Sequence, residues 1–314
     1  KYNNIEISLT VDNRNARKNG WEYKYDSNSN VIITKFNYNN DESYPTKIYI
    51  PDLLDGQKVT TIGESLFENL ENLENVFLTE NITTIENKAF YGDKNLNGLR
   101  LLDGLEKIGK MAFGKCTNLE KVLIPESVKN ISFSNGETGD NPFYGCDNII
   151  IWVHKDSDAE VEAQKENIDY KSVTVSVGGK LGYKPFQTVD KDNVSALIRY
   201  SDGRDEEIIH EELKIRYNNK NTSFRGDDTY YTVSMYDKEG LYIEKKVGVF
   251  IEKLTPEYET PTDLEAIEGM QLSEVKLPRC FEWMDEKKII ERNKNRYANM
   301  IYNAKYIPED TVNY

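Results

Sequence analysis

The sequence predicts a multidomain protein of mixed α+β to all-β class, in which a short solenoid of stacked repeats is followed by a β-sandwich and a further small β module. Its 314 residues suffice for about two or three domains of ordinary size. Three observations support this prediction. The chain repeats itself every 23 residues from Val59, it alternates like β-strands after Tyr170, and Pro256 and Pro261 mark a linker before the last segment.

The repeat can be followed through four copies. The first three start at residues 59, 82 and 105, and they read VTTIGESLFENLENLENVFLTEN, ITTIENKAFYGDKNLNGLRLLDG and LEKIGKMAFGKCTNLEKVLIPES. A fourth copy starts at Val128 and carries an insertion before its phenylalanine. Because apolar residues recur at the same places in each copy, stacking places like on like and builds one continuous core. The columns are Ile62, Ile85, Ile108 and Ile131; Phe67, Phe90, Phe113 and Phe143; Leu73, Leu96, Leu119 and Ile149; Val76, Leu99 and Val122; and Leu78, Leu101 and Ile124.

Each copy closes on a strand pattern. The sequence L-x-x-V-x-L, or L-x-x-L-x-L, alternates like a short strand. The segment before it, such as ENKAFYG or GKMAFGK, is too short for a long helix and predicts one helical or 3₁₀ turn. A polar column just before the strand predicts a ladder of side-chain amides that satisfies backbone groups of the turns. This column contains Asn72, Asn95, Asn118 and Asn148.

These copies resemble the BspA-type leucine-rich repeats, a family common on bacterial cell surfaces. Units of that family typically read I-x-x-x-A-F-x-x-C-x-x-L-x-x-V-x-I-P, and IGKMAFGKCTNLEKVLIP at 108–125 is similar to this pattern throughout. The resemblance covers residues 22–170 and implies a right-handed leucine-rich-repeat solenoid. The sequence departs from the pattern at the insertion 134–141 and at Asp93, where the family prefers Cys or a small residue.

Both ends of the repeats also resemble the family. The lead-in from Tyr23 is similar to its N-terminal hairpin, which is followed by an I-P strand and a D-G turn. The segment 149–170 resembles its exit, which is a strand, a serine and a short helix. Residue preferences alone make DAEVEAQKEN a good helix window, with Ser157 or Asp158 as the N-cap. A polar helix at this place would close the open end of the solenoid.

After Tyr170 the sequence changes to strands and turns. The expected strands are VTVSV, VSALIRY, LKIRY, YYTVSMY and KKVGVFIEKL. Strands at this spacing predict a β-sandwich. The hairpin ALIRYSDGRDEEI and the closing strand VGVFIEKL resemble those of bacterial Ig-like domains. We therefore expect a repeat domain with its hairpin and cap helix at 1–170, an Ig-like domain at 171–254 and a third module at 255–314.

The third module resembles another bacterial surface repeat, which often serves as a spacer or stalk. Its pattern joins L-x-A-x-x-G-x-x-L-x-x-V-x-L-P and a tryptophan to A-x-Y-x-P-x-D-x-x-N-Y. The resemblance implies a second Ig-like or surface-repeat β module, trimmed where the repeat would normally continue. The matching residues are Leu264, Gly269, Leu272, Leu277, Pro278, Trp283, Tyr306, Pro308, Asp310, Asn313 and Tyr314.

Composition argues against several classes of function. The net charge of −14 repels phosphate backbones, so no nucleic-acid partner is expected. No apolar run approaches the ~18–20 residues of a membrane span, so we expect no transmembrane segment in this chain. The two histidines, His154 and His210, lie in no nucleophile or zinc motif, and His154 is expected at the surface near the cap. The sequence therefore predicts no enzyme, no catalytic residues, no metal site and no cofactor.

The cysteines leave two alternatives open. Cys116 and Cys146 occupy the same column of neighbouring copies, about 4.8 Å apart in a stacked solenoid, which is close enough for a disulfide. The favoured alternative is a buried stack of unpaired thiols that fills the turn core. Cys280 stands alone in the last module, where we expect it to be partly buried.

The surface that the repeats predict for binding is the outward face of their strands. Side chains flanking the middle apolar residue of each strand point away from the core, and curved solenoids use that face for partners. Phe77 and Leu123 are expected to be exposed apolar groups on either side of Arg100. Aromatic and arginine side chains are typical interface anchors. The candidate ligand-binding residues are Asn75, Phe77, Arg100, Lys121 and Leu123.

These features predict a non-catalytic binding or adhesion protein, extracellular, either on the bacterial cell surface or secreted, and monomeric. Its partner would be a host or bacterial surface protein or a glycan. Two alternatives remain. The modules could form a structural stalk or spacer, or the chain could be an accessory region of a larger cell-wall or glycan-degrading enzyme.

Overall fold

The computed structural model describes residues 20–37, 45–134, 139–217, 223–226, 229–261, 264, 266, 269–291 and 302–313. These residues divide into two compact units. The first unit holds the chain up to Gly179 together with 191–215 and 232–246, and the second holds 180–190, 216–231 and 247–314. The expected module boundaries at 170 and 254 stay predictions.

The N-terminal lead-in contains the expected hairpin and the expected D-G turn, which joins a second antiparallel pair. Strands β1 (Trp21–Tyr25) and β2 (Val31–Phe36) pair in antiparallel fashion, and β4 (Leu53–Leu54) pairs in the same way with β5 (Gln57–Ile62). The second hairpin turns at Asp55 and Gly56, both in the left-handed region with φ of 48° and 77°. An Asp-Gly pair suits such a turn because neither residue resists positive φ strongly.

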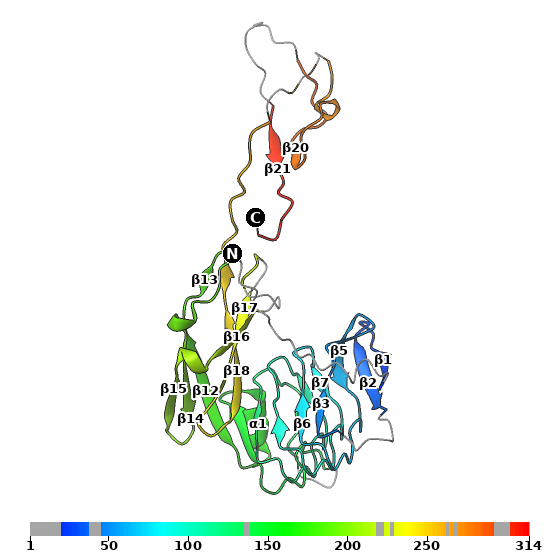
Figure 1. The fold of residues 1–314 in the computed structure, drawn as a ribbon, viewed down its shortest axis with the longest axis vertical. Helices are drawn as coiled ribbons and strands as arrows, with labels where there is room; N and C mark the ends of the chain where they lie inside the picture. Colours follow the sequence, from blue (N-terminus) through cyan, green and yellow to red (C-terminus); the bar gives the residue numbers. More distant parts are fainter. Residues whose placement is uncertain are drawn as a thin grey trace, which may run out of the picture. The chain divides into compact units, whose positions relative to one another are not determined.

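The repeats stack through two rows of parallel strands, visible side by side in the blue-to-cyan part of Figure 1. The back row joins β2, β5, β7 (Thr84–Ile85) and β9 (Lys107–Ile108). The front row joins β3 (Lys47–Tyr49), β6 (Asn75–Phe77) and β8 (Gly98–Leu99), and the next copies supply β10 (Lys121–Ile124) and β11 (Ile150–His154). The sequence predicted the front strands and missed β7 and β9 of the back row, which have two residues each, too few to show alternation.

The segment between the two rows forms hydrogen-bonded turns, so the expected helical or 3₁₀ turn was wrong. Ser65, Lys88 and Met111 occupy the same position in successive copies, and each is left-handed with φ between 50° and 53°. A left-handed residue ends a right-handed helical turn. In exchange, backbone N–H groups reach the next copy, since Ser65 donates to Asn87 at 3.0 Å and Lys88 to Lys110 at 2.9 Å.

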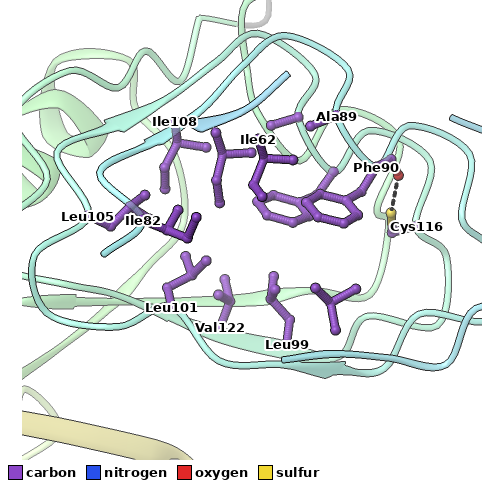
Figure 2. Close-up of a cluster of buried hydrophobic side chains, with 14 of the residues drawn as sticks. Ile62, Ile82, Ala89, Phe90, Leu99, Leu101, Leu105, Ile108, Cys116 and Val122 are labelled. Carbon is purple, nitrogen blue, oxygen red and sulfur yellow. Dashed lines mark hydrogen bonds between the residues drawn. The ribbon is translucent and has the colours of Figure 1, made fainter. Parts of the chain in front are cut away.

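The apolar columns predicted from the repeat form the core. Phe67, Phe90, Phe113 and Phe143 stack with ring centroids 5.1, 5.3 and 5.6 Å apart. Figure 2 shows how the two rows of strands contribute, because Ile62 and Ile108 of the back row point toward Leu99 and Val122 of the front row. The first three rings lie almost wholly out of water, so the copies are held together by burial that no single copy could achieve.

The expected helix closes the last copy. Helix α1 (Asp158–Lys165) is capped by Ser157, whose hydroxyl oxygen accepts a hydrogen bond from the Glu160 N–H at 3.3 Å. The Glu160 carboxylate accepts another from the Asp156 N–H at 2.7 Å. Ala159 and Ala163 face the core and are fully buried. The polar cap predicted for the end of the solenoid is therefore confirmed, with Ser157 rather than Asp158 at the N-cap.

The front row does not stop at the cap. Strand β12 (Lys171–Gly178) pairs in parallel with β11, and β14 (Ser195–Tyr200) and β15 (Asp205–Ile208) follow in antiparallel fashion. The result is one five-stranded sheet in the order β10-β11-β12-β14-β15. The expected hairpin around Asp202 and Gly203 thus belongs to a sheet that begins in the repeats.

The remaining expected strands are also present. Strands β16 (Lys214–Tyr217), β17 (Tyr230–Tyr236) and β18 (Tyr242–Gly248) form a three-stranded sheet in that order, and β13 (Gly182–Tyr183) pairs with β19 (Phe250–Ile251). Single 3₁₀ turns lie at Lys191–Asn193, His210–Glu212 and Leu272–Glu274. The strands are confirmed, whereas their closure into an Ig-like sandwich stays a prediction.

The last module has a small core of its own in the second unit. Strands β20 (Phe281–Trp283) and β21 (Ala304–Tyr306) form a hairpin-like pair, and the indole N–H of Trp283 donates to the Val275 carbonyl at 2.9 Å. Asn313 is almost fully buried and accepts a hydrogen bond from the Gly226 N–H at 3.0 Å. Two of the motif residues, Trp283 and Asn313, therefore have structural roles, while Tyr314 lies outside the described residues.

Candidate binding face

The candidate site is the outward side of the front row. We call it the strand face and define it as the outward residues of β3, β6, β8 and β10 together with Arg100, which directly follows β8. The structure brings all five predicted residues together here, in one pocket of about 210 Å³. Arg100 is exposed, and Asn75, Phe77 and Lys121 are half-buried. Leu123 is only 7% exposed, so its expected exposure was wrong.

An aromatic pair that the sequence analysis did not single out extends the face at its N-terminal end. Tyr49 of β3 stacks on Phe77 of β6, with ring centroids 4.5 Å apart and planes inclined by 7°. Tyr49 is 47% exposed. The parallel register that places Tyr49 opposite Phe77 could have been found from the strand K-I-Y-I, which aligns with N-V-F-L one copy later. The two rings form a flat apolar surface open to solvent.

The other end of the face is covered by a segment far away in sequence. We call residues 236–242 the tyrosine hairpin, since they connect β17 to β18 and begin and end with tyrosine. The Arg100 guanidinium lies 5.1 Å from the ring centroid of Tyr236 and 5.3 Å from that of Tyr242. Each such cation–π contact contributes about 0.5–1 kcal/mol when exposed. Arg100 is therefore held in place by two rings.

The tyrosine hairpin is itself rigidly built. The Asp237 carboxylate accepts hydrogen bonds from the N–H groups of Glu239 and Leu241, at 3.0 and 2.6 Å. The Tyr200 hydroxyl lies 3.0 Å from the other Asp237 oxygen and 3.2 Å from Glu206. Burial, followed by these carboxylates, raises the pKa of Tyr200, so its hydroxyl keeps its proton and donates. The loop that touches Arg100 is thus fixed from beneath.

Lys121 and Leu123 of β10 lie under the same hairpin. The Lys121 ammonium donates a hydrogen bond to the Glu239 carbonyl oxygen. Leu123 lines the pocket together with Leu241 and Tyr242, which explains its burial. The expectation of exposure failed because the partner side chains come from more than one hundred residues away, outside any repeat.

A second group of charged side chains ties β18 to the loops beside the face. The Glu244 carboxylate accepts a hydrogen bond from the Asp103 N–H at 3.0 Å, and the Lys245 ammonium lies 2.6 Å from the Glu126 carboxylate. This lysine holds the pKa of Glu126 below its ordinary value. The contacts fix the tyrosine hairpin on the strand face from its C-terminal side.

His154 lies at the edge of this group and is only 5% exposed, so its expected surface position was wrong. It closes β11 and lines a small cleft with Asp103, Glu126 and Lys245. Burial lowers the pKa of His154, opposed by the nearby Glu126 carboxylate. The imidazole is therefore neutral at pH 7 and serves the packing between the repeats and β18.

The cysteine column holds free thiols, and the alternative disulfide is not formed in the structure. The Cys116 thiol donates to the Phe90 carbonyl and the Cys146 thiol to the Phe113 carbonyl, each at 3.1 Å. Figure 2 shows the first of these bonds beside the phenylalanine stack. Burial raises the pKa of both thiols, that of Cys146 to about 11, so neither is a reactive thiolate at neutral pH.

Asp93 replaces cysteine in the same column and is fully buried. One carboxylate oxygen accepts a hydrogen bond from the Leu70 N–H at 2.7 Å, and the other has no partner among the described residues. Burial raises the pKa of Asp93 to about 8, so the carboxyl is protonated at neutral pH. Asp93 is thus a buried carboxyl group in the core of the turns, away from the strand face.

The polar ladder is present only in part. The Asn95 amide donates to the Glu71 carbonyl at 2.7 Å, and the Asn118 amide donates to Asn95 Oδ1 at 3.1 Å. All four asparagines of the column are exposed. The ladder therefore tightens neighbouring turns from the solvent side and does not fill the core.

The described residues contain no group of three or more histidine, cysteine, aspartate or glutamate side chains placed to hold a metal ion. In the same part of the chain, no helix is long and apolar enough to cross a membrane. The His210 imidazole lies 3.6 Å from the Asp192 carboxylate.

Comparison with known families agrees with this geometry. Residues 32–150 match the family model of the BspA type leucine rich repeat region, in six copies. This stretch is a BspA-type leucine-rich-repeat region. The six copies extend the four read from the sequence toward the N-terminus, where β2 and β3 already belong to the two rows. A comparison with curated proteins found no matching sequence.

Several solved structures resemble the chain. A leucine-rich-repeat protein of T. pallidum is 20% identical, with a TM-score of 0.34, over 43% of this chain and 68% of that protein. A leucine-rich-repeat protein of Bacteroides ovatus is 18% identical, with a TM-score of 0.34, over 48% of this chain and 39% of its own. A leucine rich cell surface protein of Faecalibacterium prausnitzii is 17% identical, with a TM-score of 0.34, over 60% of this chain and 59% of that protein. The chain thus spans less than two thirds of the last two.

The BspA-type region fixes the broad class of the protein. The fold is of the leucine-rich-repeat type, mostly β with few helices among the described residues, and without a closed barrel in them. Bacterial leucine-rich repeats are generally protein-interaction modules and typically have no catalytic activity. Proteins with BspA-type repeats are typically secreted or located on the bacterial surface.

Proposed function

We propose that the protein is a non-catalytic, extracellular binding or adhesion protein of the bacterial surface, or a secreted one, which holds a protein partner on its strand face. The observation that carries the proposal is the stack of Tyr49 on Phe77 next to Arg100. Two aromatic rings at one end of a row of strands, with an arginine beside them, have the composition of an interaction hot spot.

The state of these side chains supports binding over a purely structural role. Tyr49 is 47% exposed although its ring is already ordered against Phe77, so a partner would bury apolar area without first having to immobilise the side chain. Arg100 is exposed yet fixed between two tyrosines. A face that is ordered before the partner arrives loses less conformational entropy on binding.

A structural stalk is the second candidate, and one observation favours it. The five-stranded sheet joins the last two strands of the repeats, β10 and β11, to β12, β14 and β15, so the end of the repeats and the following strands share one backbone hydrogen-bond network. A spacer needs such continuity more than it needs an exposed aromatic face. The stalk and the binding protein differ in what a substitution at Tyr49 should do.

The test is a binding screen of the purified chain against matrix glycoproteins, mucins, bacterial surface proteins and polysaccharides. Each ligand found is then measured against Tyr49→Ala and against the control Tyr25→Ala, since the two tyrosines are 47% and 50% exposed. We expect Tyr49→Ala to weaken binding at least about tenfold, the loss of roughly 1.4 kcal/mol that an interface aromatic typically supplies. Tyr25→Ala should bind like the parent.

Two outcomes would count against the proposal. Equal binding by the Tyr49→Ala and Tyr25→Ala variants would move the site away from the strand face. No binding to any protein in the panel, with the chain folded and monomeric, would leave the stalk as the better account.

A further inference from the structure

We propose that the pocket between the strand face and the tyrosine hairpin binds a carboxylate of the protein partner, held by Arg100 and Lys121. The inference deepens the proposed function and rests on it, because it names the chemistry that the strand face selects. The partner segment is an acidic residue next to an apolar side chain, with the carboxylate in the pocket and the apolar side chain over Phe77 and Tyr49.

The charges around the pocket point to an anion. Arg100 and Lys121 are the charged residues among those that line it, and no lining residue is acidic. This is a local reversal of sign in a chain of net charge −14. Within the described residues, Arg100 has no carboxylate within ion-pair distance, and its neighbours are the rings of Tyr236 and Tyr242. A guanidinium held by ring faces keeps its N–H donors for a ligand.

The shape of the pocket leaves room for that ligand. Gly98 occupies the position that Asn75 and Lys121 hold in the neighbouring copies, and it contributes no side chain to the pocket. A Cβ at position 98 would lie 1.9 Å from the Asn75 side-chain oxygen. Across the pocket, Gly240 has a φ of 76°, and a Cβ there would come within 3.6 Å of the Lys121 ammonium. The space beside Gly98 is therefore taken by the Asn75 amide, and Gly240 places no side chain over the Lys121 ammonium.

The lining favours a protein segment over an acidic sugar. Beside the cations, Phe77 and five aliphatic residues line the pocket, together with two asparagines and the two tyrosines of the hairpin. The aliphatic residues are Val76, Leu99, Leu101, Leu123 and Leu241. Such surfaces gain most from burying an apolar side chain. A carboxylate that replaces its water shell with an arginine fork and an ammonium gains charge-assisted hydrogen bonds of about twice the ordinary strength. The combination matches an acidic residue flanked by phenylalanine or leucine.

The test titrates three small probes into the full chain and measures their binding by the shifts of backbone amide signals in NMR spectra. The probes are the dipeptide N-acetyl-Phe-Glu-amide, its uncharged analogue N-acetyl-Phe-Gln-amide, and glucuronate. We expect the Glu dipeptide to shift the signals of Gly98 and Gly240 in a saturable way, and to bind at least about tenfold more tightly than the Gln dipeptide. Glucuronate should bind no better than the Gln dipeptide.

Two arginine variants and a control locate the effect. Arg100→Gln should reduce the affinity for the Glu dipeptide to that for the Gln dipeptide, and Arg100→Lys should restore part of it because the charge returns without the planar fork. The control is Arg199→Gln, which removes an exposed arginine of β14 that forms an ion pair with Asp205 of β15. The control should keep the parent's affinity, and all three variants should keep the parent's melting temperature within a few degrees.

Three results would overturn the inference. Equal binding of the Glu and Gln dipeptides would show that the site does not recognise a carboxylate. Signal shifts that cluster away from Gly98 and Gly240 would show that the dipeptide binds outside the pocket. Binding of glucuronate alone would make the site one for an acidic glycan. A protein ligand whose binding is lost in Tyr49→Ala but unchanged in Arg100→Gln would keep the proposed function and refute this inference alone.

Discussion

The inside and the outside of the same strands follow different rules. Inside, each position repeats nearly the same side chain from copy to copy, as in the stack of Phe67, Phe90, Phe113 and Phe143. Outside, the same strands present Asn75, Gly98 and Lys121 at one position, and Phe77, Arg100 and Leu123 at the next.

The difference follows from what each side touches. An inward side chain packs against its counterpart in the next copy, so every copy needs a side chain of similar shape at that position. An outward side chain meets solvent, the tyrosine hairpin or a partner, none of which repeats. Columns of like residues therefore indicate packing that stabilises the fold, and variation along the strand face indicates a surface for binding.

The largest effect should come from breaking an interior column. Phe90→Ala removes a fully buried ring that stacks on both neighbours, and we expect it to lower the free energy of unfolding by about 3–5 kcal/mol. The matched change Tyr91→Ala removes the next ring along the chain, which lies half-buried under Lys88 and Lys115, and should cost less than about 1 kcal/mol. Urea unfolding followed by circular dichroism measures both, and similar losses would contradict the distinction.

The one irregular member of the turn column offers the opposite change. Asp93→Cys restores the residue found at Cys116 and Cys146, and we expect it to stabilise the protein at pH 8 by about 1–3 kcal/mol, the cost of a buried unsatisfied polar group. The Leu70 N–H keeps the Phe67 carbonyl as an acceptor at 3.3 Å.

The gain should depend on pH, because the pKa of Asp93 is raised to about 8 by burial. Between about pH 4 and pH 8 the unfolded carboxyl is ionised while the folded one keeps its proton, so the parent loses stability as the pH rises. The difference between Asp93→Cys and the parent should therefore grow from pH 5 to pH 8. A constant difference would show that the carboxyl is ionised in the folded protein.

His154 should give a dependence of the opposite sign. Burial lowers its pKa, so below its ordinary value of about 6.5 the unfolded chain binds a proton that the folded one refuses. The parent should lose stability between pH 7 and pH 5, with a slope of at most about 1.4 kcal/mol per pH unit. His154→Gln should remove this part of the loss, and an identical acid profile would mean that His154 can charge in place.

The smallest effect on stability should come from the strand face. Tyr49→Ala should change the free energy of unfolding by no more than about 0.5 kcal/mol, since the ring is half exposed and stacks on Phe77 at the surface. If Tyr49→Ala instead destabilised the protein like Phe90→Ala, the face would be part of the core, and its claim to bind a partner would fail.

Much of the interior could be predicted from the sequence, because each core residue packs against the equivalent residue 23 positions away in the next copy. Ile62, Phe90 and Val122 were placed in columns by counting, and Ser157 was found by the chemistry of helix caps. The turns were not predicted, because a left-handed lysine or methionine leaves no mark in the sequence comparable to glycine.

The strand face was predicted only in part for a related reason. Counting placed Phe77 and Arg100 correctly on it, but it could not supply Tyr236 and Tyr242, which lie outside the repeat. Leu123 and His154 were assigned to the surface for want of that segment. Contacts across more than one hundred residues follow from tertiary packing and have no local signal.

The sheet that runs from β10 to β15 also determines how the protein would respond to force. Strands β11 and β12 are parallel neighbours, so a pull on the chain from both sides drags them past each other along their length. The hydrogen bonds between them then bear the load together and must break at once, whereas α1, which connects the two strands, is bypassed and carries none of it. A bacterium that held a surface through this chain would have a mechanical clamp at the point where its repeats end.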